Sequence, residues 1–190
     1  MPQDLLLFAR EFLAAPGRVS AVSPSSRYLA RAMAAGLGPD TGPVVEFGPG
    51  TGQLTQGLLD VGVAVGNLTL FELNAGFTHL LRARYPGAAI HLAGAQEAGC
   101  YARAGSVGAV VSGLPLLSMP DLAVEAILRS AFTLLRPGGQ LRQFTYGFRP
   151  PIAPHILDRL GLVTRPLQQV WANLPPARVY ALHRMQDVAP

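Results

Sequence analysis

The chain is poor in residues that mark several large classes of protein. Its 190 residues include no lysine and one cysteine, Cys100. A single cysteine excludes an internal disulfide and is typical of a reducing compartment, and we interpret Cys100 as a small structural side chain. No uncharged apolar run reaches roughly 18 residues, so we expect no membrane-spanning helix. The four histidines, at positions 79, 91, 155 and 183, lack the spacing of metal ligands, so we expect no metal site.

Acidic residues are scarce in the C-terminal third. Residues 1–126 carry seven arginines and nine acids, a net charge of −2, whereas residues 127–190 carry eight arginines and two acids, a net charge of +6. A basic segment favours an anionic partner such as a membrane surface, a nucleic acid or a phosphorylated substrate. Ordinary solvated arginines would give the same composition. Charged residues interrupt the apolar N-terminus and no small-residue cleavage site follows, so we expect no signal peptide.

Glycine is abundant, and the most informative stretch is Val44-Val45-Glu46-Phe47-Gly48-Pro49-Gly50-Thr51-Gly52. The apolar residues predict a buried strand, and the glycines predict a tight turn that opens a helix and lets a ligand approach the backbone. A dinucleotide loop presents helix N–H groups to phosphate. Glu46 beside that position disfavours a phosphate and favours a cation. The loop therefore predicts a nucleoside that carries a positive amine and a sulfonium, S-adenosylmethionine (SAM).

A second acid supports this interpretation. Leu68-Thr69-Leu70-Phe71-Glu72 is another strand-like run, and Glu72 lies 20 positions after Gly52, where a doubly wound fold places an acid on ribose hydroxyls. A glycine-rich turn with two capping acids is the simpler alternative, but it does not explain why both acids end apolar strands. The residues predicted to bind SAM are Glu46, Gly48, Gly50, Thr51, Gly52, Gln53, Glu72, Leu73, Asn74, Gly94, Ala95, Gln96 and Ser112.

Helix and strand patterns alternate along the chain as in a single α/β domain with a parallel sheet. We expect residues 1–36 to cover the site and residues 37–190 to form the cofactor-binding unit. Ser25 or Ser26 is the expected N-cap of a helix that ends at Gly36. The expected helices are 3–14, 25–36, 52–61, 75–84, 96–103, 120–135 and 151–160, and the expected strands are 43–47, 68–72, 88–92, 107–112, 140–146, 162–171 and 177–184.

This order resembles the class I SAM-dependent methyltransferases, whose Rossmann-like, seven-stranded sheet ends in an antiparallel hairpin. Further strings across the chain resemble the bacterial phospholipid N-methyltransferases. They are Ala21-Val22-Ser23-Pro24-Ser25-Ser26, Val111-Ser112-Gly113-Leu114-Pro115-Leu116-Leu117-Ser118-Met119-Pro120, Gln143-Phe144-Thr145-Tyr146-Gly147 and Asn173-Leu174-Pro175-Pro176-Ala177. The chain departs from the superfamily after the third strand, where Gly94-Ala95-Gln96 stands in place of Gly-Asp-Ala. We expect Gln96 or a backbone carbonyl to take the adenine amino group instead.

The resemblance implies an enzyme that transfers methyl groups from SAM to the amine of phosphatidylethanolamine, stepwise towards phosphatidylcholine, and releases S-adenosylhomocysteine. It implies a cytoplasmic protein held peripherally on the inner face of the cytoplasmic membrane. Anionic lipids would be favoured, and neither nucleic acid nor metal is expected as a partner.

Methyl transfer to an amine requires alignment and a deprotonated nitrogen. Tyr146, at the end of the fifth strand, is the first candidate to orient the amine or to hold a methylated ammonium by cation–π attraction. Alternatively, its ring only packs. The backbone carbonyls of Ser112, Gly113 and Leu114 are expected to accept amine N–H groups, as the matching loop does in amino methyltransferases.

The headgroup phosphate needs donors from the segment that this family folds over the active site. The candidates are Arg18, Ser23, Ser25, Arg27 and Tyr28, with Trp171 and Arg178 as weaker ones. A helix N-terminus near Ser25 would itself favour an anion. Each of these residues has the alternative role of a cap or a surface charge.

The N-terminal segment carries Leu5, Phe8 and Phe12 at helical spacing, which predicts an amphipathic helix over residues 3–14. Such a helix spans about 18 Å, too short to cross a membrane but suited to lying in its interface. Packing on the protein's own core or on another subunit is the alternative.

Other functions share the predicted fold. An adenine N6-methyltransferase acting on RNA would need an aromatic side chain to stack on the base, where this chain has Leu116. A membrane-surface protein that binds SAM without turnover is a third possibility, which the intact glycines and acids disfavour. Among lipids, ornithine lipids and partly methylated phosphatidylethanolamines are alternative substrates.

Overall fold

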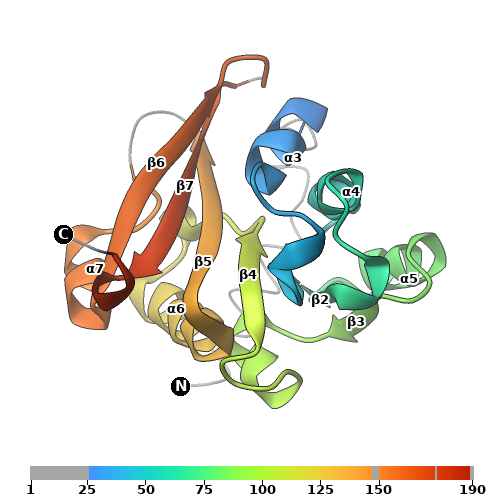
Figure 1. Ribbon diagram of the computed structural model, residues 1–190, viewed down its shortest axis with the longest axis horizontal. Helices are drawn as coiled ribbons and strands as arrows, with labels where there is room; N and C mark the ends of the chain where they lie inside the picture. Colours follow the sequence, from blue (N-terminus) through green and yellow to red (C-terminus); the bar gives the residue numbers. More distant parts are fainter. Residues whose placement is uncertain (1–25, 147–149, 174, 189–190) are drawn as a thin grey trace.

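A single mixed sheet organises the chain (Figure 1). The computed structural model describes residues 26–146, 150–173 and 175–188. The sheet has seven strands in the order β3-β2-β1-β4-β5-β7-β6. Their bounds are β1 Val44–Phe47, β2 Leu68–Glu72, β3 Ala89–Leu92, β4 Val107–Ser112, β5 Leu135–Tyr146, β6 Leu162–Val170 and β7 Ala177–Arg184. The first five strands are parallel, and β7 runs antiparallel to both β5 and β6.

Helices cover both faces of this sheet. The α-helices are α3 Arg27–Ala34, α4 Gln53–Asp60, α5 Ala75–Arg84, α6 Asp121–Leu134 and α7 Pro154–Leu160. Short 3-10 helices lie at η1 Pro39–Thr41, η2 Val65–Asn67, η3 Ala95–Cys100, η4 Leu116–Ser118 and η5 Met185–Asp187. One buried cluster joins the sheet to α6 and α7, and a second joins it to α3, α4 and α5. Because both faces are covered, the central strands β1 and β4 are buried throughout.

The predicted fold class is confirmed, and the differences are local. The expected helix over 96–103 is the 3-10 helix η3. Strand β5 begins at Leu135 instead of 140, because Leu135 already pairs with Val107 before the Pro137-Gly138 turn shifts the register. Pro120 is the N-cap of α6 and not its first residue. The amphipathic helix expected over 3–14 lies outside the described residues. Among the described helices, none is long and apolar enough to cross a membrane.

A buried arginine fixes the end of α3 to the sheet. Arg142 on β5 is 4% exposed, and its Nη1 donates to the carbonyl oxygens of Met33 at 3.2 Å and Ala35 at 2.5 Å. Burial lowers the pKa of Arg142. These carbonyls belong to the C-terminal end of the helix, where the aligned peptide dipoles favour a positive charge. The arginine therefore caps α3 from the neighbouring strand.

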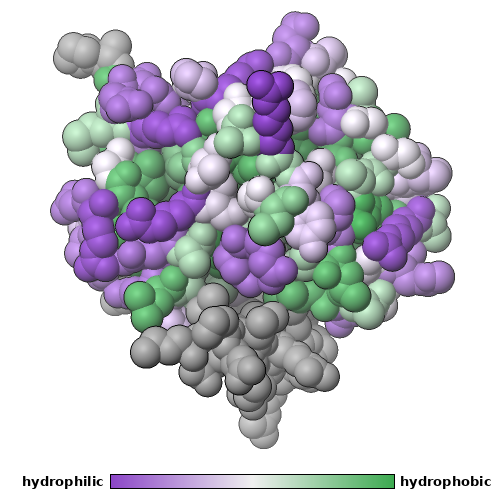
Figure 2. All heavy atoms as spheres, turned by 90° about the horizontal axis from the view of Figure 1, so that it is seen from below, coloured by the Kyte–Doolittle hydropathy of each residue, from purple (hydrophilic) through white to green (hydrophobic). Residues whose placement is uncertain are grey.

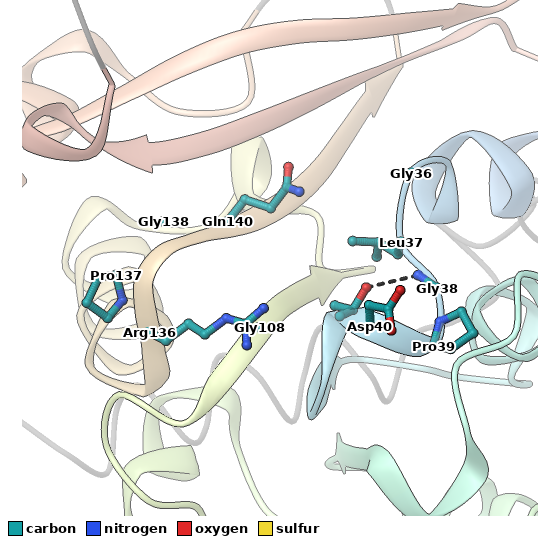
Figure 3. A pocket seen from close by; sticks show the side chains of 11 residues that line it. Gly36, Leu37, Gly38, Pro39, Asp40, Gly108, Arg136, Pro137, Gly138 and Gln140 are labelled. Carbon is teal, nitrogen blue, oxygen red and sulfur yellow. Dashed lines mark hydrogen bonds between the residues drawn. The ribbon is translucent and has the colours of Figure 1, made fainter.

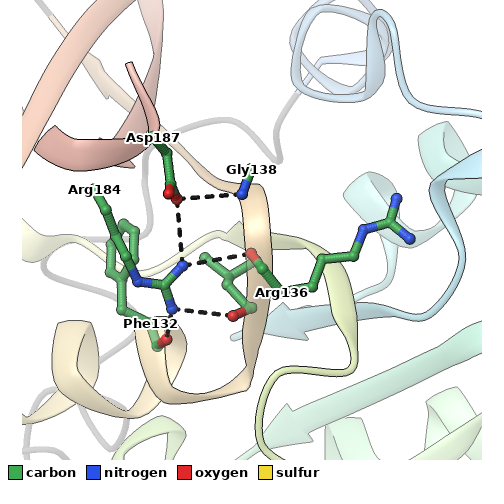
Figure 4. A network of polar contacts seen from close by, with 6 residues as sticks. Phe132, Arg136, Gly138, Arg184 and Asp187 are labelled. Atoms are coloured by element: carbon green, nitrogen blue, oxygen red, sulfur yellow. Dashed lines mark hydrogen bonds and ion pairs between the residues drawn. The ribbon is translucent and has the colours of Figure 1, made fainter. Parts of the chain in front are cut away.

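A second arginine closes the turn between α6 and β5 (Figure 4). Arg184 on β7 donates to the carbonyl oxygens of Phe132, Leu135 and Arg136. It also pairs with Asp187, whose Oδ2 accepts the N–H of Gly138 at 3.2 Å. Arg184 thus satisfies one carbonyl in the last turn of α6 and two at the start of β5, which accounts structurally for part of the basic C-terminal third.

Helices α3 and α4 touch at a glycine, which gives a first prediction. A Cβ added to Gly57 would lie 2.8 Å from the carbonyl oxygen of Ala30. We expect Gly57→Ala to lower the free energy of unfolding by about 1–3 kcal/mol, because overpacking outweighs the gain in helix propensity. Urea denaturation measures this change. The control is Gly99→Ala, where the added Cβ has no neighbour within 4 Å. Equal midpoints for both variants would contradict the close contact.

Candidate functional site

The loop after β1 lies at the carboxyl edge of the sheet, where β1, β2 and β4 end side by side. Gly48, Gly50 and Gly52 all have positive φ, at 66°, 55° and 85°. This left-handed conformation is readily adopted only by glycine. Gly48 donates its N–H to the Phe71 carbonyl at 2.9 Å, and Gly52 donates to the Pro49 carbonyl at 2.8 Å. The sequence spacing thus produces the tight strand-to-helix turn that it predicted.

Two of these glycines are needed for close packing within the protein. A Cβ on Gly48 would lie 2.7 Å from the Leu114 side chain, and one on Gly52 would lie 2.7 Å from the Tyr85 ring. Tyr85 also donates its hydroxyl to the Gly52 carbonyl at 2.8 Å. Tyr85 was not predicted from the sequence, because its position before Pro86 indicated only the end of a helix.

Gly50 differs because the space in front of it is open. A Cβ built there meets no atom of the described residues within 4 Å. The Gly50 N–H donates to Glu72 Oε2 at 3.0 Å, and the Asn74 N–H donates to Glu72 Oε1 at 2.8 Å. Glu72 is therefore fixed at the end of β2 beside the loop. A carboxylate has about four acceptor positions, so two remain for hydroxyl groups of a ligand.

Glu46 is the most unusual group of the site. Its carboxyl group is fully buried at the end of β1. Oε2 accepts the Thr55 hydroxyl at 2.7 Å, whereas Oε1 accepts no hydrogen bond from the described residues. Burial, with a smaller contribution from the nearby negative charge of Glu72, raises the pKa of Glu46 to about 8. A buried carboxyl oxygen without a partner is costly, so it indicates a ligand donor or cation.

The loop after β4 packs directly against the glycine loop. Gly113 donates its N–H to the Phe47 carbonyl at 2.8 Å, and a Cβ on Gly113 would lie 2.7 Å from the Gly48 carbonyl oxygen. Ser112 is buried, and its Oγ accepts the Leu114 N–H at 3.3 Å. The structure therefore brings the residues expected to contact the amine to the cofactor loop.

The carbonyl of Leu114 already has a partner, which sequence reasoning missed. The side chain of Gln143 donates from Nε2 to this carbonyl at 2.9 Å and to the Phe144 carbonyl at 3.0 Å. The Leu116 N–H donates to the same carbonyl at 3.0 Å, so both acceptor positions of the Leu114 carbonyl are used within the protein. Gln143 Oε1 is buried without a partner among the described residues. The resemblance string that begins at Gln143 includes this residue, but it does not indicate the contact with Leu114.

The expected adenine contact at Gln96 is constrained by its neighbours. The Gln96 side chain folds back over Gly94, where a Cβ would lie 2.3 Å from Nε2. Gln96 Nε2 donates to Glu97 Oε1 at 3.2 Å. The amide is thus oriented within the loop, and its role towards adenine stays a prediction.

Tyr146 lies at the end of β5, three residues beyond the point where Ser112 pairs with Gln143. It is half-buried and packs edge-on against Phe144 with ring centroids 5.4 Å apart. Burial raises the pKa of the Tyr146 hydroxyl, and a hydrogen bond with the Asn173 side chain lowers it by less. The hydroxyl is therefore neutral at physiological pH, as an orienting group for an amine requires.

The expected phosphate donors are only partly described. Arg27 donates to the Tyr28 hydroxyl at 3.3 Å and lies 5.2 Å from the Tyr28 ring centroid, at the exposed start of α3. Trp171 in the turn after β6 is 70% exposed. Arg178 Nε donates to Gln169 Oε1 at 2.8 Å, across the hairpin. The remaining phosphate-donor candidates, Arg18, Ser23 and Ser25, lie outside the described residues. The residues predicted to face the membrane, Leu5, Phe8 and Phe12, also lie outside them.

A separate cleft of about 520 Å³ lies at the opposite, amino edge of the sheet (Figure 3). It lies between the segment 36–41 and the turn 136–138, with Arg136 and Asp40 on its walls. None of the predicted site residues lines it. The predicted site and this cleft are therefore distinct.

The face of the molecule seen from below interleaves hydrophilic and hydrophobic residues (Figure 2).

Comparison with solved structures identifies the fold. The chain is similar to Burkholderia thailandensis 1,6-didemethyltoxoflavin-N1-methyltransferase with bound 1,6-didemethyltoxoflavin and S-adenosylhomocysteine, with a TM-score of 0.67 and 16% identity over 96% of this chain and 90% of that one. The chain is also similar to an rRNA methylase from Streptococcus thermophilus, with a TM-score of 0.58 and 19% identity over 87% of this chain and 99% of that one. For the CurJ carbon methyltransferase, the TM-score is 0.59 and the identity 16% over 78% of this chain. The match covers 50% of the CurJ chain, so this chain spans about half the length of that protein.

No protein-family model and no curated protein matches the sequence. At these low identities the solved structures show the fold alone, and that fold is the Rossmann-like one of class I SAM-dependent methyltransferases. The neighbours act on different substrates, so the substrate of this chain must be argued from its own residues.

Proposed function

We propose that this protein is a SAM-dependent N-methyltransferase whose substrate is the amine of phosphatidylethanolamine. The observation that carries the cofactor assignment is that Glu46 and Gly50 both leave room for a ligand at the same edge of the sheet. Among the residues that the structure describes, Glu46 Oε1 is buried and has no hydrogen-bond partner, and no side chain or backbone atom fills the space in front of Gly50 at the same edge of the sheet. A positively charged group of a ligand fits beside the Glu46 oxygen, and a ligand can contact the protein backbone at Gly50. The residues present therefore suit a cationic nucleoside better than a phosphate.

SAM supplies an electrophilic methyl group on a sulfonium. Glu72 would hold ribose hydroxyls with its free acceptor positions, and Glu46 would face the positive charges. The role of the protein in such a displacement is alignment and the exclusion of water. Thr55 orients Glu46, and the backbone N–H groups of Gly50 and Asn74 orient Glu72.

For the substrate, we assign the amine to Tyr146 and to the carbonyls of Ser112 and Gly113 at the start of the loop after β4. A neutral Tyr146 hydroxyl accepts an amine N–H, and its ring face can hold the methylated ammonium that forms. The strings that resemble phospholipid N-methyltransferases include this tyrosine and this loop. Arg27, Tyr28 and Trp171 are exposed, and arginine and aromatic side chains suit a lipid headgroup and a bilayer interface.

RNA is the less favoured substrate. A base-methylating relative needs an aromatic ring after the loop proline to stack on the base. The corresponding residue here, Leu116, is 3% exposed and belongs to the core cluster beneath α6. It therefore offers no stacking surface.

The experiment that tests the proposal offers several acceptors in parallel. Purified protein is incubated with methyl-labelled SAM and vesicles of phosphatidylethanolamine, its monomethyl or dimethyl form, or ornithine lipid, and separately with rRNA. We expect label in phosphatidylethanolamine and its methylated forms. Label confined to ornithine lipid would move the substrate assignment within lipids, and label in rRNA alone would overturn it.

The Tyr146 hydroxyl gives a prediction of its own. We expect Tyr146→Phe to lower kcat for lipid methylation about ten- to a hundredfold with SAM affinity unchanged, because one hydrogen bond to the reacting amine is lost. The matched control is Tyr101→Phe, because the exposed Tyr101 ring, just after η3, lies tilted against His91 with ring centroids 4.5 Å apart. Full activity in Tyr146→Phe would reduce Tyr146 to packing or to cation–π contact.

A further inference from the structure

The cleft at the amino edge of the sheet is walled by two turns that the proposed methyl transfer does not use (Figure 3). Residues 36–41 lie between α3 and β1, and residues 136–138 form the turn near the start of β5. The volume of about 520 Å³ lies within the range of roughly 300–1,000 Å³ that is typical of small-molecule sites. The cleft is therefore large enough for an organic molecule, and its polar groups indicate the chemistry of that molecule.

Arg136 brings a positive charge to one wall of the cleft. Its side chain extends from the turn towards the segment 36–41 (Figure 3), and its Nη1 lies 3.8 Å from a Cβ built on Gly42. Within the described part of the chain, its guanidinium group donates to no acceptor and pairs with no carboxylate, Asp40 on the facing wall included. An exposed arginine of this kind is ordinarily solvated, so a binding site requires a second group.

A buried arginine supplies that second group. Arg142 is 4% exposed, its Nη1 donates to the carbonyls at the end of α3, and its Nε donates to Gln140 Oε1 at 3.3 Å. Its Nη2 donates to no atom of the described residues. Apart from the chain neighbours of Gly36, this Nη2 is the only described atom within 4 Å of a Cβ built on Gly36, which lines the cleft. Donors of a buried cation are costly to leave unused, so Nη2 indicates an acceptor beside Gly36.

The side chain of Gln140 adds a further donor to the cleft. Because its Oε1 accepts from Arg142, its Nε2 is left to donate, and this nitrogen has no acceptor among the residues that the structure describes. Three donor groups, those of Arg136, Arg142 and Gln140, thus stand against one carboxylate, that of Asp40. Guanidinium groups match the paired oxygens of carboxylates and phosphates. The balance of groups therefore favours an anion.

We propose that this cleft is a second ligand site, which takes a small organic anion with a carboxylate or a phosphate group. The anionic group lies between Arg136 and the Nη2 of Arg142, and Asp40 accepts a hydrogen bond from a hydroxyl or amino group of the same ligand. The site lies at the edge of the sheet opposite the glycine loop, so it does not depend on the proposed methyl transfer.

Calorimetric titration of the full-length protein with inorganic phosphate and, separately, with succinate tests the site, at constant ionic strength set with sodium chloride. Arg136→Gln removes the charge and keeps the backbone carbonyl that Arg184 contacts. We expect this variant to bind the probe about tenfold more weakly or worse, because a hydrogen bond to a charged group is lost. The matched control is Arg129→Gln on the exposed side of α6, which should bind the probe as the wild type does.

A second variant changes the affinity in the opposite direction. Asp40→Asn removes the negative charge that repels the probe, so we expect tighter binding. In amide NMR spectra, the probe should shift the N–H signals of Gly36 and Gln140 and leave that of Gly50 unchanged. Affinity for SAM should be the same in all variants.

Binding of phosphate alone or of succinate alone would identify the acidic group that the site takes. No binding of either probe at millimolar concentration would overturn the proposal. Equal affinity in wild type and Arg136→Gln, an equal loss in Arg129→Gln, or weaker binding to Asp40→Asn would overturn it as well.

Discussion

Replacing Gly50 by alanine is expected to weaken SAM binding at least about a hundredfold, a loss of about 2.8 kcal/mol. The added methyl group would occupy the open space in front of the loop, where the ligand must approach the backbone. Within the described part of the chain, no atom lies within 4 Å of that methyl position, so packing among these residues is not disturbed. Calorimetric titration with SAM measures the change in affinity.

The backbone strain of this substitution has a matched control. Gly105 has φ of +66°, close to the +55° of Gly50, and an added Cβ there also meets no atom of the described residues within 4 Å. Both variants should lose about 1–2 kcal/mol of folding stability, the cost of a left-handed alanine. Only Gly50→Ala should lose affinity for SAM. Equal affinities in the two variants would mean that the space at Gly50 is not the ligand's.

The second large effect concerns the charge of Glu46. Its pKa is about 8 in the folded protein against 4.5 for the ordinary group. Because the folded-state value is raised, the unfolded chain loses this proton first as the pH rises. The free energy of unfolding without ligand should therefore fall between about pH 4.5 and pH 8, by about 1.4 kcal/mol per unit at most. Glu46→Gln should remove this component, whereas the surface variant Asp60→Asn should keep it.

A cationic ligand reverses the sign of this dependence. It favours the ionised form of Glu46, so binding below pH 8 should release a proton, and SAM affinity should rise up to tenfold per pH unit. Calorimetry in buffers of different ionisation enthalpy counts the released protons. Glu46→Gln should bind weakly and without this proton release. Undiminished affinity in Glu46→Gln would show that the buried oxygen does not face the ligand's charge.

The strands and the two acids could be predicted because their signals are local. A β-branched run that ends in alternating glycines has few alternatives. Glu46 is the last residue but one of β1, before these glycines, and Glu72 is the last residue of β2. The fold class followed from the order of these elements. The start of β5 was predicted too late because Pro137 and Gly138 resemble a break, although the backbone before them already pairs with β4.

The contacts that complete the site are long-range and left no pattern in the sequence. Asn173 reaches Ser26 across 147 positions, and Arg142 reaches Met33 across 109. Gln143 takes the carbonyl of Leu114, which sequence reasoning reserved for the amine alone. Nothing in the residue types fixes such pairings, because they depend on how β5 and the hairpin lie against α3.

The central claim is that the glycine loop, Glu46 and Glu72 together form the SAM site. A crystal structure of the protein with S-adenosylhomocysteine tests it most directly. We expect density for the ribose against Glu72, and for the amino group on the side of Glu46, with the ligand in contact with the backbone at Gly50. Density in the cleft beside Arg136, with none at the glycine loop, would contradict the claim.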